Sequence, residues 1–175
     1  MCFIYKYASP LGGITAASNG NALIGLWFDG QKYFGCNLPP KCEEKNLPVF
    51  EKTALWLDIF FSGKPPQFAL PLSISATPFR RSVWDIIAAV PYGQTITYGE
   101  IADIIANANG LLKMSPQAVG GAVAHNPFLL VVPCHRVIGS DGSLTGYAAG
   151  ISKKSKLLDL EKTGRIYISP QIQEK

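Results

Sequence analysis

The stretch Val132-Pro133-Cys134-His135-Arg136-Val137 decides how the C-terminal half of this chain is interpreted. It follows the apolar run Phe128–Val131 and precedes a glycine-rich turn at residues 139–142. A thiol reacts as its thiolate, and a nearby base or positive charge lowers its pKa. Cys134, beside a histidine and an arginine at the exit of a buried segment, therefore has the setting of a nucleophile.

His135 is the first candidate for the base that serves this cysteine. Adjacent residues of an extended segment point in opposite directions, so a bridging water is the easier geometry for the pair. A histidine with this role needs a partner on its other ring nitrogen. Glu161 is the expected partner, because it falls on the apolar face of a helix that we expect Ser152 to cap, and buried carboxylates are usually paired. The alternative is that Glu161 turns outward at the helix end before Gly164.

Composition places the chain among compact globular proteins. Its 175 residues suit one domain or two small ones sharing a core, and 47% of them are hydrophobic against 16% charged. The formal net charge of +4 is compatible with a polyanionic partner without requiring one. No apolar run is long enough to span a bilayer, and the N-terminus is not a signal peptide. We expect a monomer in the cytoplasm, or in the nucleus of a eukaryote.

The four cysteines are Cys2, Cys36, Cys42 and Cys134. Without a secretory signal, disulfides are not expected. A zinc site built from the first three is disfavoured, because the Cys36–Cys42 spacing is wide and no histidine lies nearby. We predict that these three are packing or surface thiols and that the protein holds no metal.

The pattern along the chain predicts an α+β fold. Short strands at Phe3–Tyr7, Gly13–Ser18 and Ala22–Phe28 are followed by a helix at Phe50–Phe61. We expect this small mixed-sheet domain to occupy residues 1–75, with a mainly helical domain over residues 76–175. The apolar side of the first helix is predicted to carry Ala54, Leu55, Leu57 and Phe61.

Three helices are predicted after residue 76. Thr77 caps the first, with Pro78 in its first turn, and the Thr97–Glu100 capping box begins the second. Ser115-Pro116 starts the third, which Asn126-Pro127 ends. The expected buried positions are Phe79, Val83, Ile86, Ile87 and Val90 in the first helix, and Ile101, Ile104 and Ile105 in the second.

The third helix contains Gly120-Gly121, which costs roughly 1 kcal/mol per glycine relative to alanine. Such a cost indicates that something approaches the backbone closely. Helix–helix packing is one explanation. The other is a helix-turn-helix that lies against nucleic acid, although the connecting loop is longer than usual.

Taken together, these residues resemble the O6-alkylguanine-DNA alkyltransferases (methylated-DNA–protein-cysteine methyltransferases). The resemblance runs from Thr77 to Gly164 and rests on stretches in the family's order and spacing. They are Pro91-Tyr92-Gly93, Thr97-Tyr98, Ala118–Ala122, Asn126-Pro127, Pro133–Val137, Gly146-Tyr147 and Glu161. The N-terminal third resembles the family only in general character.

The resemblance implies direct-reversal repair of double-stranded DNA that contains O6-alkylguanine, in a single-turnover reaction without a cofactor. The helix-turn-helix binds the minor groove, the damaged guanine is flipped into a pocket, and Cys134 accepts the alkyl group. His135 acts as base through water and Glu161 orients it. Tyr98 donates to guanine N3, and Asn126 braces the turn that holds the cysteine.

The resemblance also assigns the remaining site residues. Arg136 is expected to be structural. The lesion pocket is expected to be lined by Leu129, Val132, Pro133, Val137, Tyr147 and Ala148. The DNA-binding surface is expected to comprise Tyr98, Ser115, Gln117, Ala118, Gly120, Gly121 and Val123.

Gln117 departs from the family pattern, in which an arginine at this position enters the duplex and fills the gap left by the flipped base. Glutamine can hydrogen-bond to the orphaned base, but it has no charge and little stacking surface. We therefore expect weaker binding or slower flipping with the thiol chemistry intact.

Two other functions remain as alternatives. One is a non-catalytic or poorly catalytic sensor of alkylated DNA, although relatives of that kind replace the cysteine. The other is a cysteine hydrolase, for which His125 is the only separate histidine in the chain.

Overall fold

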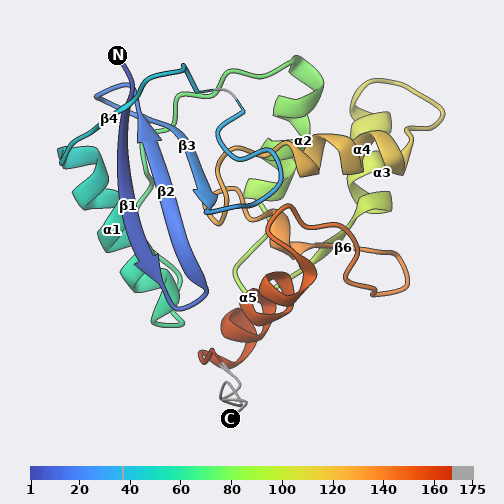
Figure 1. The fold of residues 1–175 in the computed structure, drawn as a ribbon. Coiled ribbons are helices and arrows are strands. Elements are labelled where there is room, and N and C mark those ends of the chain that lie inside the picture. Colours follow the sequence, from blue (N-terminus) through green and yellow to red (C-terminus); the bar gives the residue numbers. More distant parts are fainter. Residues whose placement is uncertain (37, 167–175) are drawn as a thin grey trace, which may run out of the picture.

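The N-terminal sheet has four strands in the order β3-β2-β1-β4. The computed structural model describes residues 1–36 and 38–166. Strands β1 (Phe3–Ser9), β2 (Gly12–Ser18) and β3 (Leu23–Phe28) pair antiparallel, and the short β4 (Glu43–Glu44) runs parallel to β1. Figure 1 shows this sheet and helix α1 in one half of the molecule and helices α2–α4 in the other. The predicted α+β organisation is confirmed.

Helix α1 (Pro48–Phe61) forms as predicted, but of the four residues on its predicted apolar side only Leu57 is buried. Leu55 is 54% exposed, and Ala54 and Phe61 are only partly buried. The side chains that the helix buries recur at intervals of three and four residues, which is the spacing of one helical face. They are Val49, Phe50, Thr53, Trp56, Leu57 and Phe60.

The C-terminal half contains the three helices predicted between residues 77 and 127 and the helix predicted around Glu161. These helices are α2 (Pro78–Ala88), α3 (Tyr98–Ala108), α4 (Pro116–Ala124) and α5 (Ile151–Thr163). A two-stranded parallel sheet joins β5 (Ile96–Thr97) to β6 (Val137–Ile138), which follows the 3-10 turn η1 (Cys134–Arg136). The segment that carries Cys134 and His135 is therefore a turn and not an extended strand.

Local signals placed the helix starts well, with one exception. The Thr77 hydroxyl accepts from the backbone N–H of Arg80, and both hydrogen bonds of the Thr97–Glu100 capping box are present. Helix α5, however, begins at Ile151 after Gly150, so Ser152 is not its cap. In α2, Phe79 and Ile86 are only partly buried, and in α3 Ile104 is 45% exposed while Ile101 and Ile105 are buried.

The two halves share one hydrophobic core. The Leu26 N–H of β3 donates to the Pro127 carbonyl (2.7 Å), and the Leu129 N–H donates in return to the Leu26 carbonyl (3.0 Å). The sheet is thus joined by backbone hydrogen bonds to the segment that leads to Cys134. None of the helices in the described part of the chain is long and apolar enough to cross a membrane.

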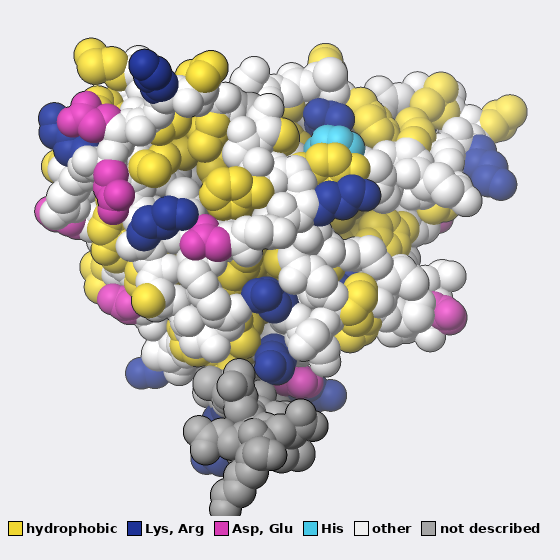
Figure 2. Space-filling model, viewed as in Figure 1, with side chains coloured by type: hydrophobic (Ala, Val, Ile, Leu, Met, Phe, Trp, Pro, Cys, Tyr) yellow, Lys and Arg dark blue, Asp and Glu magenta, His cyan; other side chains and the backbone are white. Residues whose placement is uncertain are grey.

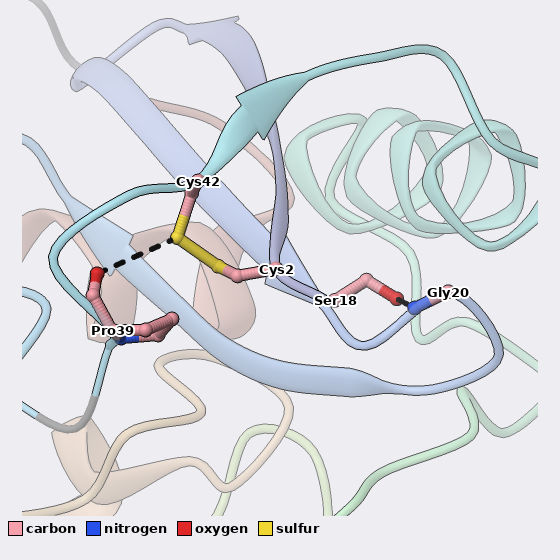
Figure 3. The surroundings of a disulfide bond; sticks show 5 residues. All are labelled: Cys2, Ser18, Gly20, Pro39 and Cys42. Atoms are coloured by element: carbon pink, nitrogen blue, oxygen red, sulfur yellow. Dashed lines mark hydrogen bonds between the residues drawn. A yellow bond between two sulfur atoms is a disulfide. The ribbon is translucent and has the colours of Figure 1, made fainter.

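A disulfide joins Cys2 to Cys42, which contradicts the expectation of free thiols (Figure 3). The physical reason lies in the strand register. Phe3 of β1 pairs with Glu43 of β4, so the residues that precede them meet side by side, and the Glu43 N–H donates to the Cys2 carbonyl (2.9 Å). Cys36 is an exposed free thiol. Among residues 1–36 and 38–166, no three His, Cys, Asp or Glu side chains gather as a metal site.

Candidate functional site

A cavity of about 520 Å³ opens between α4, the loop at residues 139–150 and the N-terminal half. Cys134 lies on its wall, although the cysteine as a whole is only 4% exposed. The surface of the wall is mostly apolar with a few polar side chains, as in many ligand pockets. The full lining is Lys32, Tyr33, Tyr98, Pro116, Gln117, Gly120, Val123, Ala124, Cys134, Thr145, Gly146, Tyr147 and Ala148.

The turn that carries Cys134 is held by hydrogen bonds to its own backbone. The Cys134 N–H donates to the Val132 carbonyl (2.8 Å) across Pro133, whose φ of −79° and ψ of 67° are those of an inverse γ-turn. The Asn126 amide donates to the same carbonyl (2.7 Å) and accepts from the Phe128 N–H (2.9 Å). Asn126 thus occupies the bracing position expected of it.

His135 and Glu161 form a buried pair behind the cysteine. His135 Nε2 lies 2.6 Å from Glu161 Oε1, and both side chains are fully buried. The Phe60 ring, from α1, packs against the His135 ring in a T-shaped arrangement with centroids 6.1 Å apart. Glu161 therefore faces inward, and the alternative in which it turns out to solvent is excluded.

The pairing leaves one nitrogen of His135 available as a base. Because Glu161 is an acceptor when ionised, Nε2 carries the proton and Nδ1 carries the lone pair. His135 Nδ1 is buried and makes no hydrogen bond to any described residue. A neutral histidine in this tautomer can accept a proton at Nδ1 while Glu161 stabilises the resulting charge.

Arg136 completes the binding of Glu161. Its Nε donates to Glu161 Oε2 (2.9 Å), its Nη2 donates to Oε1 (2.9 Å), and its Nη1 donates to the Val90 carbonyl (2.6 Å). The backbone N–H of Gly93, in the Pro91-Tyr92-Gly93 turn, also donates to Oε2 (2.9 Å). This bidentate contact fixes the position of the carboxylate, which is consistent with the structural role expected of Arg136.

The electrostatics favour a protonated thiol next to a neutral base. Burial raises the pKa of the Cys134 thiol to about 11, although Asn126, the charge of Lys154 and backbone N–H groups each lower it. Burial lowers the pKa of His135. Burial alone raises the pKa of Glu161, but hydrogen bonds from His135 and Arg136 outweigh it and lower that pKa to about 2. A reaction at Cys134 therefore requires removal of its proton.

The loop opposite the cysteine is held by Tyr98 and Lys154. The Tyr98 hydroxyl donates to the Thr145 carbonyl (3.0 Å), and burial raises its pKa. The fully buried Lys154 donates to the carbonyls of Val137 (2.5 Å), Thr145 (3.0 Å) and Gly146 (3.3 Å). Sequence reasoning missed Lys154, because a lysine in a charged helix gives no local sign that it is buried.

Helix α4 presents a small and uncharged face at the cavity. Gln117, Gly120 and Val123 line the cavity, whereas Ser115, Ala118 and Gly121 are exposed on the helix. A Cβ added at Gly121 meets no atom within 4 Å, and one at Gly120 comes no closer than 3.9 Å to the Tyr98 ring. Helix–helix packing therefore does not explain Gly121.

The remaining predicted residues divide into two groups. Tyr147 and Ala148 line the cavity as expected. Leu129, Val132, Pro133 and Val137 are buried and are not part of the cavity wall. The Nδ1 of His125 lies 2.7 Å from the Gly121 carbonyl, and its ring stacks on Tyr33, so His125 is committed elsewhere and is not a partner for Cys134.

Fold and site together define a two-part α+β protein in which a buried thiol, backed by a histidine–glutamate pair, faces a cavity beside helices α3 and α4. Family comparisons agree with this description. Residues 78–163 match the DNA binding domain of 6-O-methylguanine DNA methyltransferase, and residues 3–74 match the ribonuclease-like domain of the same family. This chain belongs to the methylated-DNA–protein-cysteine methyltransferase family.

Individual relatives are similar over most of their length. The methylated-DNA–protein-cysteine methyltransferase of Methanosarcina barkeri is 43% identical over 155 residues, covering 88% of this chain and 93% of the relative. That of Mycobacterium bovis is 40% identical over 156 residues, covering 89% of each. The crystal structure of Mycobacterium tuberculosis OGT in complex with DNA superposes with a TM-score of 0.80 at 36% identity, covering 93% of this chain and 94% of that one.

Proposed function

We propose that this protein repairs O6-alkylguanine in DNA by transferring the alkyl group to Cys134. The observation that carries the proposal is the placement of Cys134 on the wall of a cavity, next to a histidine whose other nitrogen is held by Glu161. Membership of the methylated-DNA–protein-cysteine methyltransferases supports it. A thiol between a base and a cavity can attack an electrophilic carbon delivered there.

The transfer step balances without a cofactor. The thiol proton of Cys134 passes through a water molecule to His135 Nδ1, and the sulfur attacks the alkyl carbon on O6. The new C–S bond forms as the C–O bond breaks, and the electron pair goes to the guanine. The proton held on His135 then passes to a ring nitrogen of the guanine and neutralises the base. The thiol proton is thereby accounted for. The thioether product is not hydrolysed, and each molecule reacts once.

Tyr98 is proposed to assist the departing base. Its hydroxyl is a donor at neutral pH and lies on the cavity wall. It now donates to the Thr145 carbonyl, so it must exchange that bond for guanine N3 when the base enters. A donor aimed at a site of developing negative charge stabilises the transition state.

The duplex is proposed to lie against α4, because a base inside a stacked duplex cannot reach Cys134 and must be flipped out. Gln117 and Gly120 lie at the junction between that helix and the cavity. The small, exposed residues Ser115, Ala118 and Gly121 allow the DNA backbone to approach α4 closely.

Since its substrate is DNA, the protein is expected in the cytoplasm, or in the nucleus of a eukaryote.

Intact mass after incubation with a duplex that contains O6-methylguanine tests the proposal. We expect one added methylene (about 14 Da) on the peptide with Cys134, no further turnover, and no adduct in Cys134→Ser. Tight binding without an adduct would indicate a lesion sensor and overturn the proposal. Repeated turnover of an ester or peptide would indicate a hydrolase.

The role of Gln117 is tested separately by Gln117→Arg. A guanidinium adds charge and stacking surface at the point where the flipped base leaves a gap. We expect tighter duplex binding and faster repair, with an unchanged rate toward a free O6-alkylguanine base. If the variant neither tightens duplex binding nor speeds repair, glutamine at this position does not limit binding or base flipping.

A further inference from the structure

The N-terminal half contributes part of the cavity wall, through the loop that follows β3. Lys32 and Tyr33 of this loop line the cavity that holds Cys134. Figure 1 shows the loop reaching from the end of β3 toward the C-terminal helices. No motif of the N-terminal half predicted this contact, and the reaction proposed above does not use either side chain.

The loop is fastened to both sides of the cavity. The backbone N–H of Lys32 donates to the carbonyl of Ala148 (3.0 Å), in the loop opposite α4. The Tyr33 ring stacks on the ring of His125, the residue that ends α4, with centroids 4.1 Å apart and an interplanar angle of 26°. His125 is itself held by its contact with the Gly121 carbonyl. Lys32 is therefore positioned relative to α4 as well as to the active-site loop.

Tyr33 adopts this position at a conformational cost. Its φ is 61°, in the left-handed region that residues other than glycine seldom occupy and that costs roughly 1–2 kcal/mol. Strain of this kind persists where the surroundings determine it, and it concentrates at functional sites. The stack on His125 and the hydrogen bond from the Cys36 N–H to the Tyr33 carbonyl (3.3 Å) both hold the tyrosine here.

Charge singles out Lys32 on this surface. Helix α4, with the sequence PQAVGGAVA, carries no charged side chain, and Lys32 is the one charged residue among those that line the cavity. The Lys32 ammonium lies 5.1 Å from the Tyr33 ring centroid, and it forms no ion pair with any residue in the described part of the chain. Figure 2 shows lysine or arginine side chains beside the histidine that is visible on this face.

We propose that Lys32 binds a backbone phosphate of the DNA strand whose flipped nucleotide enters the cavity, which makes the N-terminal half part of the DNA interface. An ammonium is a point charge suited to a phosphate, and phosphate contacts set the position of a protein on the duplex. Tyr33 and His125 are positioning residues for Lys32. The proposal rests on the proposed function, because it assumes that the cavity receives a base from DNA.

The effect of one such contact can be estimated. Each phosphate neutralised on B-DNA contributes about 0.9 to the slope of log K against log salt concentration. Loss of the contact should therefore raise the dissociation constant for the duplex about tenfold at 0.1 M salt. The reaction with a free base should lose less than the reaction with duplex, because a free base has no phosphate.

The experiment compares Lys32→Gln with the matched control Lys64→Gln, an exposed lysine in the segment after α1. Both are placed in a Cys134→Ser background, and binding to a duplex with O6-methylguanine is measured at several salt concentrations. We expect Lys32→Gln to bind about tenfold more weakly with a slope lower by about one, and Lys64→Gln to match the parent. Equal slopes for Lys32→Gln and the parent would overturn the proposal.

Two further measurements distinguish a failure of the proposed phosphate contact from a failure of the proposed alkyl transfer. With Cys134 restored, the rates of Lys32→Gln toward free O6-benzylguanine and toward duplex are compared with those of the parent. A larger loss toward duplex than toward the free base supports a phosphate contact, and an equal loss toward both would place Lys32 in the pocket chemistry instead. If the parent forms no adduct but Lys32→Gln still lowers the salt slope, the transfer proposal fails and the phosphate contact stands.

Tyr33 variants test the positioning. Tyr33→Phe keeps the stack on His125 and should bind as the parent does. Tyr33→Ala removes the ring and should lower affinity and salt slope in the direction of Lys32→Gln. Parent-like binding by Tyr33→Ala would show that the stack does not position Lys32.

Discussion

Cys134 is protonated and shielded at rest, although it is the residue on which the proposed function depends. Its pKa of about 11 follows from burial, and its exposure is 4%. The base beside it is kept neutral by burial and oriented by Glu161. Reactivity is therefore expected to appear when a substrate fills the cavity and the proton can pass to His135.

This predicts a contrast between the two free cysteines. At pH 7 a thiol with a pKa of about 11 is ionised in roughly one molecule in ten thousand, so iodoacetamide should modify Cys134 slowly. Exposed Cys36 should react first. Peptide mass analysis over time checks this, with Cys36→Ser as control. Rapid neutral-pH modification of Cys134 in that variant would contradict the buried, protonated thiol.

At the scale of elements, α4 contains two adjacent glycines, which destabilise a helix relative to alanine. Nothing in the described part of the protein approaches the position of a Cβ at Gly121, so the intramolecular packing explanation fails there. The remaining explanation is an external surface that must come close to the helix.

Gly121→Ala separates stability from binding. The substitution should raise the free energy of unfolding by about 1 kcal/mol, because alanine is the better helix former and its methyl group meets no neighbour. It should also weaken binding to a duplex while leaving the reaction with a free O6-alkylguanine base unchanged. Urea unfolding and a binding titration measure the two effects. A loss of stability would show that packing selects the glycine after all.

The Cys2–Cys42 disulfide is also a feature of elements, since it joins the start of β1 to the start of β4. Its residues are 40 apart in sequence, so its removal should lower the free energy of unfolding by about 2–4 kcal/mol through the entropy of the unfolded chain. Urea unfolding with and without reductant checks this. Cys2→Ser/Cys42→Ser serves as the control and should not respond to reductant, and alkyl transfer should persist in it.

At the scale of the whole molecule, a single carboxylate connects three separate parts of the chain. Glu161 of α5 binds His135 and Arg136 of the active-site turn and the backbone of Gly93 between α2 and β5. These bonds stabilise the C-terminal half only while the carboxylate is ionised.

Lowering the pH should therefore destabilise the protein in two successive pH ranges. His135 has a lowered pKa in the folded state, so its contribution is lost as pH falls below about 6.5, where the unfolded chain takes up a proton. Glu161 has a folded pKa of about 2, so its contribution is present above about pH 4.5 and is lost as pH falls toward 2. The urea midpoint should fall accordingly from pH 7 downward.

Glu161→Gln tests this assignment. It should cost about 3–5 kcal/mol at pH 7, because the buried Arg136 loses its partner, and should flatten the dependence on pH below 4.5. Asp159→Asn, on the exposed side of the same helix, should leave both unchanged. A wild-type midpoint that does not change between pH 7 and 3 would contradict the role of the buried pair.

Much of the site could be predicted from sequence, because the signals are local. The caps at Thr77 and Thr97, the glycine pair of α4 and the Pro133–Val137 motif each depend on neighbours within a few residues. Glu161 could be assigned to His135 because helical periodicity placed it on a buried face. The wrong face for α1 and the misplaced cap of α5 mark where such periodicity is ambiguous.

Only the tertiary structure decided the contacts between distant segments. The sequence by itself determined the α+β organisation, the family and the pairing of His135 with Glu161, and it predicts Cys134 as the nucleophile. It did not determine the Cys2–Cys42 pair, the burial of Lys154 or the approach of Lys32 and Tyr33 to the cavity. Those depend on strand register and on the packing of the two halves, which arise from many long-range contacts and leave no pattern in the residues that they bring together.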